Sequence, residues 1–288
     1  MVQNGIIIKS IGGLYVIESS DTIYECRARG IFRKDGISPS VGDSVNFENG
    51  VITEILPRKN FIIRPPLANL DQLIFVVSVT EPAPNLLILD KFIAVAQYQK
   101  IKPIIVLTKV DLESFENIYD IYKRAGIEIY VVNYNDENPA ESIRMLLKDK
   151  ISAFTGNSGA GKSTLLNEVC GDFEIATGEI SKKLGRGRHT TRHSELYKLP
   201  WGGYIADTPG FSTFETNKYN IIKKEELAGC FTEFARFEGE CKFRDCSHTK
   251  EKGCKIIEAV EKGLIPKTRH ESYCSMYEEA KLIKEWEL

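Results

Sequence analysis

The chain has 288 residues, enough for two or three domains that each bury a core of their own. Hydrophobic residues make up 42% of it and charged residues 27%, an ordinary balance for a globular protein, and the formal net charge is −2. This charge excludes nucleic-acid binding through bulk positive charge, so any such binding must come from local basic patches. No apolar run approaches the length of a membrane span, and the N-terminus lacks the basic start of a secretory signal. We expect a cytoplasmic protein with no membrane partner, and a monomer.

Residues 1–65 consist of short segments that favour β-structure. Each segment is rich in β-branched and aromatic residues, and turn signals such as Gly12-Gly13 separate one segment from the next. Five short strands with no helical period predict a small barrel of the OB type as the first domain. The expected strands are Gly5–Lys9, Leu14–Glu18, Thr22–Arg29, Ser44–Glu48 and Val51–Ile55.

One stretch of this barrel carries basic and aromatic residues together. Such a mixture is typical of an RNA-binding face, because bases stack on aromatic rings while cations meet the phosphates. The same charges could instead protect an exposed strand edge from pairing with another chain, and the sequence leaves both interpretations open. The residues are Arg27, Arg29, Arg33 and Lys34, interleaved with Tyr24 and Phe32.

A second domain follows the boundary at Arg64-Pro65-Pro66 and is expected to span residues 66–214. Buried-strand patterns alternate here with helical spacing, which predicts a parallel α/β sheet covered by helices. The expected strands are Gln72–Val79, Lys102–Leu107 and Ile127–Val132, and the expected helices are Pro84–Lys100 and Asn117–Ala125.

The second of these strands leads into the tetrapeptide TKVD, which matches the [NT]-K-x-D motif of guanine-specific GTPases. Asp111 can accept hydrogen bonds from both N1–H and the N2 amino group of guanine, a donor pair that adenine lacks. The stem of Lys109 would pack over the base. Thr108 stands where Asn is commoner, which leaves the contact of this side chain open. A companion base-contacting loop is expected near Asn133 and Tyr134, although the usual Ser-Ala signal is absent there.

Residues 156–163 match the phosphate-loop pattern G-x-x-x-x-G-K-[ST] in full, between a strand-like run and a helical pattern. Glycines let successive backbone N–H groups surround a phosphate, and the helix N-terminus adds its positive dipole end. Lys162 is expected to reach the β- and γ-phosphates, and the Ser163 hydroxyl to ligate Mg²⁺. The expected nucleotide-binding set in this stretch is Gly156, Asn157, Ser158, Gly159, Ala160, Gly161, Lys162, Ser163 and Thr164.

Two motifs after the phosphate loop are typical of nucleotide switches. Ser181–His193 is a basic segment in which Thr190 and Thr191 are candidates to ligate Mg²⁺ and to sense the γ-phosphate. The charge of this segment also suits contact with an RNA backbone, or a merely solvated loop. Further on, Asp207 begins a D-x-x-G motif: its carboxylate is expected to hold Mg²⁺ through water, and the Gly210 N–H to meet the γ-phosphate.

The order of these motifs differs from that of ordinary GTPases. An ordinary GTPase runs from the phosphate loop through the switch Thr and D-x-x-G to K-x-D. Here residues 108–111 precede residues 156–163, which precede residues 207–210. This order indicates a circular permutation, which surface termini make tolerable because the core sheet is kept intact.

The third expected domain, residues 215–288, carries a cluster of cysteines. Cys241, Cys246, His248 and Cys254 follow the spacing C-x4-C-x-H-x5-C, and three thiolates with one imidazole match a closed structural zinc site. Chance clustering of free cysteines is the alternative. The other four of the seven cysteines are scattered and are expected to be packing residues. Two closing helices, at 258–263 and 269–286, make this domain mostly helical.

Together these motifs resemble one family, the circularly permuted GTPases of small-ribosomal-subunit biogenesis known as RsgA, YjeQ or YloQ. The resemblance covers nearly the whole chain, because an OB-like N-terminus, TKVD, GNSGAGKST, GRGRHTT, DTPGF and CKFRDCSHTKEKGC appear in the family's order. It implies GTP hydrolysis stimulated by the small ribosomal subunit during late assembly, with the OB domain contacting ribosomal RNA. It also implies one structural Zn²⁺ per chain and Mg²⁺ with GTP. The chain departs from the family at Asn133 and Tyr134, which replace small residues, and at Lys252, which replaces a usual Pro.

The residue that positions the attacking water does not follow from the D-x-x-G motif. Ras-like GTPases carry a Gln directly after it, whereas Phe211 occupies this position and has no polar group. His189 is the candidate catalytic residue, because it lies beside the switch threonines and a neutral imidazole can accept a proton from water near pH 7. The family resemblance points to the same histidine, and a solvated or RNA-facing role is the alternative.

Two other functions compete with that of a GTPase in subunit assembly. A small-molecule P-loop kinase or ATPase would share the phosphate loop, but the TKVD motif argues against it. A nucleic-acid-binding module with a GTP-sensing, weakly hydrolytic site is the second alternative, and GTP turnover stimulated by small subunits would exclude it.

Overall fold

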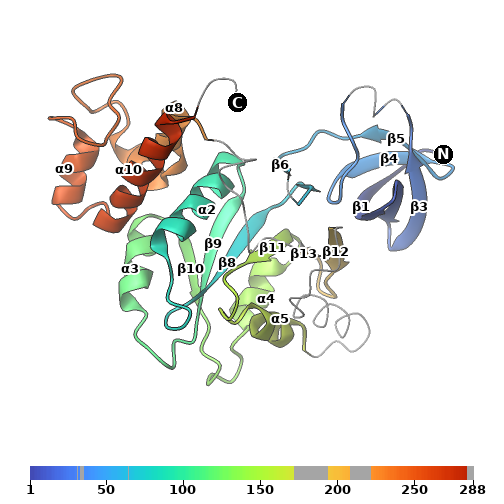
Figure 1. Cartoon of the computed structure of the whole chain (residues 1–288). Coiled ribbons are helices and arrows are strands. Elements are labelled where there is room, and N and C mark those ends of the chain that lie inside the picture. Colours follow the sequence, from blue (N-terminus) through green and yellow to red (C-terminus); the bar gives the residue numbers. More distant parts are fainter. Residues whose placement is uncertain (31, 33–35, 64, 172–193, 208–221, 284–288) are drawn as a thin grey trace.

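The computed structural model describes residues 1–30, 32, 36–63, 65–171, 194–207 and 222–283, and Figure 1 shows their arrangement. Several sequence predictions fall outside these residues. They concern His189, Thr190, Thr191 and Gly210, the basic residues Arg33 and Lys34, and the domain boundary at 214/215. The division into domains 1–65, 66–214 and 215–288 stays a prediction.

The N-terminal part is a closed five-stranded barrel. Its strands are β1 (Gln3–Ile11), β2 (Leu14–Ser19), β3 (Thr22–Ala28), β4 (Ser44–Glu48) and β5 (Val51–Ile55). They are joined in the order β1-β2-β3-β5-β4, and β4 pairs back onto β1. This closure confirms the predicted OB-like barrel. Alternate residues such as Ile7, Ile17 and Phe47 are buried inside it, as the period of a strand requires.

The connection after the barrel is attached to both neighbours. It contains a small sheet of β6 (Phe61–Ile62) and β7 (Leu67–Ala68). On the barrel side, the Arg58 guanidinium donates two hydrogen bonds of 2.7 Å to the fully buried carboxylate of Asp43. On the other side, the Asp71 carboxylate accepts the Ile151 N–H at 2.8 Å.

The central part is a parallel sheet with one antiparallel edge strand. The parallel strands are β8 (Gln72–Ser78), β9 (Lys102–Thr108), β10 (Glu128–Val131), β11 (Ile151–Thr155) and β13 (Tyr204–Asp207), in the order β10-β9-β8-β11-β13. Strand β12 (Glu195–Lys198) then pairs antiparallel with β13. All of β8 is buried, which explains why its sequence is almost continuously apolar.

Helices cover both faces of this sheet. On one face, α2 (Leu86–Tyr98) and α3 (Glu116–Arg124) pack in one hydrophobic core with Phe75 and Val77. On the other, α4 (Glu141–Leu147) and α5 (Lys162–Cys170) pack with Ile74 and Val76. The helix α4 and the strand β12 were not predicted, because each is short and has little periodic pattern.

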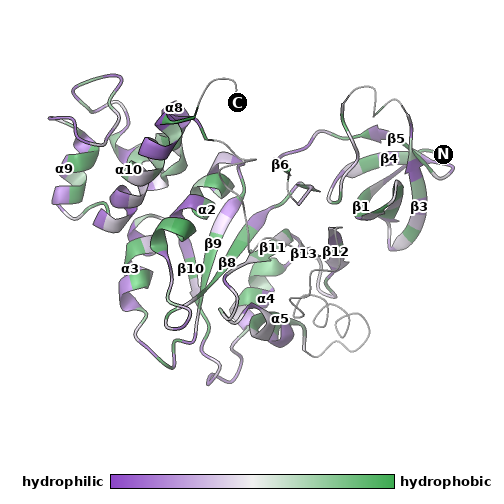
Figure 2. Ribbon diagram, viewed as in Figure 1, coloured by the Kyte–Doolittle hydropathy of each residue, from purple (hydrophilic) through white to green (hydrophobic). Residues whose placement is uncertain are grey.

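The C-terminal part packs against the outer side of α2 (Figure 1). It consists of α8 (Lys224–Leu227), the 3₁₀-helices η2 (Ala228–Cys230) and η3 (Thr232–Phe237), α9 (Lys255–Glu261) and α10 (Lys267–Lys281). Ala94 and Val95 of α2 share its hydrophobic core with Phe231 and Tyr273. Helices such as α3 and α10 carry both hydrophobic and hydrophilic residues in Figure 2, as expected of helices with one buried side.

A buried ion network fastens α10 to α2. Arg269 is fully buried and donates to the Asp90 carboxylate of α2 at 2.7 Å and to the Glu233 carboxylate of η3 at 2.7 and 3.2 Å. The Tyr122 hydroxyl donates to Asp90 at 2.9 Å. The network therefore places one cation between two buried anions at the junction of the central and C-terminal parts.

The barrel and the central sheet are hydrogen-bonded to each other. Strand β1 pairs with β12, so one sheet of eleven strands runs from β10 through the central part into the barrel. Within the described ranges, no helix is both long and apolar enough to cross a membrane.

Candidate nucleotide-binding site and metal centre

The phosphate loop lies between β11 and α5, at the carboxyl edge of the parallel sheet. Gly156 comes so close to β8 that a Cβ there would lie 2.4 Å from the Val76 carbonyl oxygen, so no other residue fits. Gly161 caps α5 with a φ of 89°, a left-handed conformation that glycine adopts without strain. The loop therefore leads directly into the N-terminus of α5, where backbone N–H groups and the helix dipole favour a phosphate.

The TKVD motif and the phosphate loop are in direct contact, although they lie about fifty residues apart in sequence. Thr108 is the last residue of β9 and is fully buried. Its hydroxyl donates a hydrogen bond of 2.7 Å to the carbonyl oxygen of Ala160 in the phosphate loop. The Thr108 side chain, whose contact does not follow from the sequence, thus joins the two motifs.

Two further residues of the motif are more exposed. Lys109 has a φ of 59°, and its ammonium donates to the Glu81 carbonyl oxygen in the loop between β8 and α2. Asp111 is exposed at the same edge of the sheet, where its carboxylate is accessible to a base. Because β9 and β11 are both parallel to β8, Asp111 and the phosphate loop lie at the same end of the sheet.

The loop after β10, where a base-contacting loop is expected, has a local turn and one packed ring. The Asn133 side chain accepts the Asn135 N–H at 3.1 Å, which closes a local turn. Tyr134 packs against the core beneath α4 and α5, and its hydroxyl has no hydrogen-bond partner among the described residues. Burial and the negative charge of Glu168 raise the pKa of Tyr134 to about 12. The ring of Tyr134 therefore acts as a packing residue.

The strand that carries the D-x-x-G motif lies beside the phosphate-loop strand. β13 pairs in parallel with β11 and ends at Asp207, so the motif begins at the same edge of the sheet as residues 156–163. The described residues thus bring together three of the predicted segments, residues 108–111, 156–163 and the position of Asp207. Thr190, Thr191, His189 and Gly210 are not placed by the described residues.

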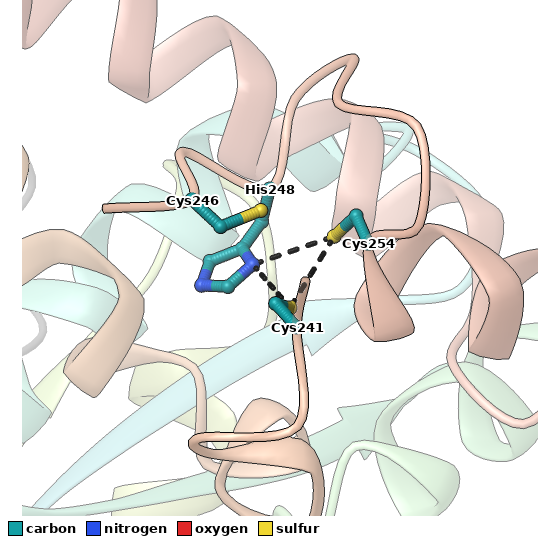
Figure 3. A group of neighbouring side chains, drawn as sticks. All are labelled: Cys241, Cys246, His248 and Cys254. Carbon is teal, nitrogen blue, oxygen red and sulfur yellow. Dashed lines mark hydrogen bonds between the residues drawn. The ribbon is translucent and has the colours of Figure 1, made fainter. Parts of the chain in front are cut away.

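The four candidate zinc ligands form a compact cluster. Their ligand atoms all lie within 4.8 Å of one another, and Figure 3 shows the three cysteine sulfurs gathered around the His248 ring. The Cys241 and Cys254 sulfurs are 3.8 Å apart, and His248 Nδ1 lies 3.6 Å and 3.4 Å from them. A tetrahedral Zn²⁺ with ordinary bond lengths requires about 3.8 Å between two sulfurs and about 3.5 Å between sulfur and nitrogen. The ligand atoms of Cys241, His248 and Cys254 therefore have the spacing of a tetrahedral zinc site, and the Cys246 sulfur lies within 4.8 Å of them as the fourth candidate ligand.

The surroundings of the cluster also suit a metal. Burial raises the pKa of Cys246 to about 12 and raises that of Cys254, so these sulfurs need a cation to be stable as thiolates. The Glu251 carboxylate accepts the backbone N–H groups of Ser247 and Thr249 at 3.0 and 3.1 Å, which shapes the loop between two ligands. Hydrogen bonds from neighbouring groups lower the pKa of Glu251 to about 2, against the opposing effect of burial.

The fold and the site define a class of protein. A phosphate loop joined to a guanine-recognition motif at the carboxyl edge of a parallel sheet, with its motifs in permuted order, is a circularly permuted P-loop GTPase. The chain belongs to the RsgA family of GTPases: the family model for the RsgA GTPase matches residues 55–217, and that for the RsgA N-terminal domain matches residues 4–53. It is therefore a GTP hydrolase, and the alternative of a small-molecule kinase is not supported.

Relatives cover the chain along almost its whole length. A protein of Caldanaerobacter subterraneus subsp. tengcongensis named small ribosomal subunit biogenesis GTPase RsgA is 44% identical over 96% of this chain and 95% of its own. The crystal structure of YjeQ from Thermotoga maritima matches with a TM-score of 0.82 at 31% identity, covering 99% of this chain and all of that one. The crystal structure of YloQ, described as a circularly permuted GTPase, matches with a TM-score of 0.78 at 34% identity, covering 98% and 96%.

Two contacts at and beside this site have no signal in the sequence. The Glu81 carbonyl, which meets the Lys109 ammonium, is a backbone atom of a loop and has no sequence signal. The ion pair between Lys9 and Glu195 joins the barrel to the strand beside β13 and links residues that lie 186 positions apart. A lone charged residue in a short strand gives no signal of such a partner.

Proposed function

We propose that the chain is a GTPase that binds the small ribosomal subunit and acts in its late assembly, with hydrolysis stimulated by that subunit. The observation that carries the nucleotide part is the hydrogen bond from Thr108 to Ala160, because it joins a guanine motif to a phosphate loop. The ribosomal part is supported by the relatives, which are named small ribosomal subunit biogenesis GTPases. Because the proposed partner is a ribosomal subunit, the proposed location of the chain is the cytoplasm.

The proposed roles at the nucleotide follow from position and chemistry. Backbone N–H groups of residues 156–164 surround the phosphates, and Lys162 adds a positive charge to them. Asp111 accepts the two donors of guanine. Ser163 and Asp207 hold Mg²⁺, which supplies charge neutralisation for the phosphate oxygens when it is bound. Thr190, Thr191 and Gly210 complete the nucleotide-binding set from the switch segments.

We assign the catalytic role to His189, on the sequence argument given above. A neutral imidazole beside the γ-phosphate orients the water and accepts its proton, and GTP yields GDP and phosphate. The nucleotide contacts assigned above do not involve His189. His189→Ala is therefore expected to keep nucleotide affinity and to lose most of the subunit-stimulated hydrolysis.

The two flanking parts have separate proposed roles. The Cys₃His cluster binds one Zn²⁺ that stabilises the C-terminal part, since four protein ligands leave no open position for chemistry. The barrel contacts ribosomal RNA through the face that carries Arg27 and Arg29, both of which are exposed. The chain acts as a monomer, which size-exclusion chromatography with light scattering would check.

The experiment that tests this function is GTP turnover with purified ribosomal subunits. Small subunits are expected to raise kcat, and large subunits at the same concentration are the control for unspecific RNA effects. The His189→Ala variant is measured in parallel, with nucleotide affinity as the control for folding. Equal turnover with small subunits, with large subunits and without either would contradict the proposal.

A further inference from the structure

The barrel is attached to the central sheet at the strand next to the D-x-x-G strand. Lys9 of β1 lies opposite Glu195 of β12, the one register pair between these strands in the described ranges. Strand β12 begins at Glu195, only four residues after Thr191 in the sequence. In the sequence, the basic segment that contains Thr190 and Thr191 therefore leads directly into β12, the strand that pairs with the barrel.

The pairing of β12 with β13 places Glu195 beside the start of the D-x-x-G motif. In the antiparallel pair of β12 and β13, Glu195 lies opposite Asp207. Lys9, Glu195 and Asp207 thus occupy one row across three adjacent strands, from the barrel to the start of the D-x-x-G motif. Residues directly opposite each other in an antiparallel pair have Cα atoms about 4.5–5.5 Å apart, so a charge at Glu195 lies close to Asp207.

Ion pairs fix β12 to the barrel on both of its faces. On one face, Lys9 Nζ lies 2.8 Å from Glu195 Oε1, and the Tyr197 hydroxyl donates to Glu195 Oε2 at 3.2 Å. On the other face, the Lys198 ammonium contacts the carboxylates of Glu18 and Asp21, and these two hydrogen bonds raise the pKa of Lys198. Alternate residues of a strand face opposite sides, so the barrel supplies a cation to one face of β12 and anions to the other.

The Lys9–Glu195 pair is less exposed than most surface ion pairs. Lys9 is 32% exposed and Glu195 is 25% exposed, so solvent screens their attraction only in part. If the barrel moved away, Glu195 would lose the Lys9 ammonium while keeping its place opposite Asp207. Loss of the Lys9 ammonium would leave the Glu195 carboxylate less compensated on the strand that pairs with Asp207.

We propose that Lys9 of the barrel is a positioning residue for the nucleotide site, acting through Glu195 on the strand end that carries Asp207. The pair sets the position of β12 and the charge beside Asp207, and it does so only while the barrel is docked. Whatever the barrel binds thereby changes nucleotide affinity, and the nucleotide changes barrel binding by the same factor, because such coupling is reciprocal. The inference rests on the proposed role of Asp207 in holding Mg²⁺.

The test compares charge reversals with a charge swap in the full chain. The variants are Lys9→Glu, Glu195→Lys and the double variant that carries both. We measure the Kd of a non-hydrolysable fluorescent GTP analogue with Mg²⁺, and the kcat and KM of GTP hydrolysis without ribosomal subunits. Lys9→Glu is expected to raise Kd and KM about threefold to tenfold, while kcat stays within about twofold. The reason is that losing the Lys9–Glu195 pair weakens binding of the ground state and of the transition state equally. The double variant is expected to restore Kd and KM to within about twofold of the parent, since it re-forms the pair.

A matched control separates this effect from a general loss of a cross-strand pair. Lys102 and Glu128 form an exposed ion pair between β9 and β10 in the same sheet, away from the D-x-x-G strand. Lys102→Glu is expected to leave Kd, KM and kcat at parental values. Amide hydrogen exchange of residues 3–11 is expected to slow when the GTP analogue binds to the parent, but not in Lys9→Glu.

Three outcomes would overturn the inference. They are a parental Kd in folded Lys9→Glu, a raised Kd that the double variant fails to restore, and unchanged exchange of residues 3–11 in the parent on binding. If Lys9→Glu does not fold, the double variant alone decides, because a raised Kd in a folded double variant contradicts the role of the pair. No ribosomal subunit is present in these assays, so a negative result leaves the proposed subunit-stimulated function untouched, and the turnover experiment above tests that function separately.

Discussion

Removing the Arg269 guanidinium should destabilise the junction between the central and C-terminal parts. Arg269 is fully buried and holds Asp90 and Glu233, which are 1% and 2% exposed, through three hydrogen bonds. In Arg269→Met the two carboxylates lose their cation while they stay buried. Breaking a buried ion pair by removing one partner costs about 3–5 kcal/mol, mostly because the remaining charge is left uncompensated. We expect a loss of stability in this range.

The measurement is urea and thermal unfolding followed by circular dichroism. For domains of 150–250 residues, 1 kcal/mol shifts the midpoint by about 2–4 °C, so a fall of roughly 6–20 °C is expected. Lys267→Met on the same helix is the matched control, because the Lys267–Glu271 pair is exposed and is worth at most about 1 kcal/mol. Adding Asp90→Asn and Glu233→Gln to Arg269→Met should recover part of the loss. A change below about 1 kcal/mol in Arg269→Met would refute the reasoning.

Two further predictions concern the site and the metal cluster. Thr108→Val keeps the shape of the side chain but leaves the Ala160 carbonyl without its donor, so GDP affinity should fall about tenfold in a fluorescence titration. Thr53→Val, which removes a similar bond to Asn46 in the barrel, should leave GDP affinity unchanged, and equal affinities in all three proteins would count against the role of Thr108. Elemental analysis should find one zinc per chain, and chelation should unfold the C-terminal part; a folded, zinc-free preparation would contradict this prediction.

The parts of this structure that the sequence predicted well depend on local patterns. The barrel strands Ser44–Glu48 and Val51–Ile55 were predicted with their observed ends. Turn residues lie at the ends of both segments, and β-branched and aromatic residues within them indicate strands. The phosphate loop and the Cys₃His cluster were predictable for the same reason, since each is a short segment whose spacing the chemistry fixes. A pattern within a few residues is enough to identify such elements.

The parts that the sequence did not predict depend on contacts between distant segments. Neither the Arg269 network nor the Lys9–Glu195 pair has a local signal, because a buried and a solvated charge look alike in sequence. The packing of the Tyr134 ring against the core that includes α5 also had no signal in the sequence. The contact of Thr108 with Ala160 required the register of β9 against β8 and β11, which only the folded sheet supplies.

The permuted motifs are expected to form one guanine-specific site at the edge of the sheet. The measurement that tests this expectation most directly is competition of GTP and ATP for bound fluorescent GDP with Mg²⁺ present, in the parent and in Asp111→Asn. GTP should displace the probe from the parent, and ATP should fail even at about a hundredfold higher concentration, because adenine lacks the donor pair that Asp111 accepts. Asp111→Asn should weaken GTP binding and accept xanthine nucleotides, since its amide can donate to the extra oxygen. Equal displacement of the probe by ATP and GTP, or unchanged GTP affinity in Asp111→Asn, would show that these motifs do not form a guanine-specific site.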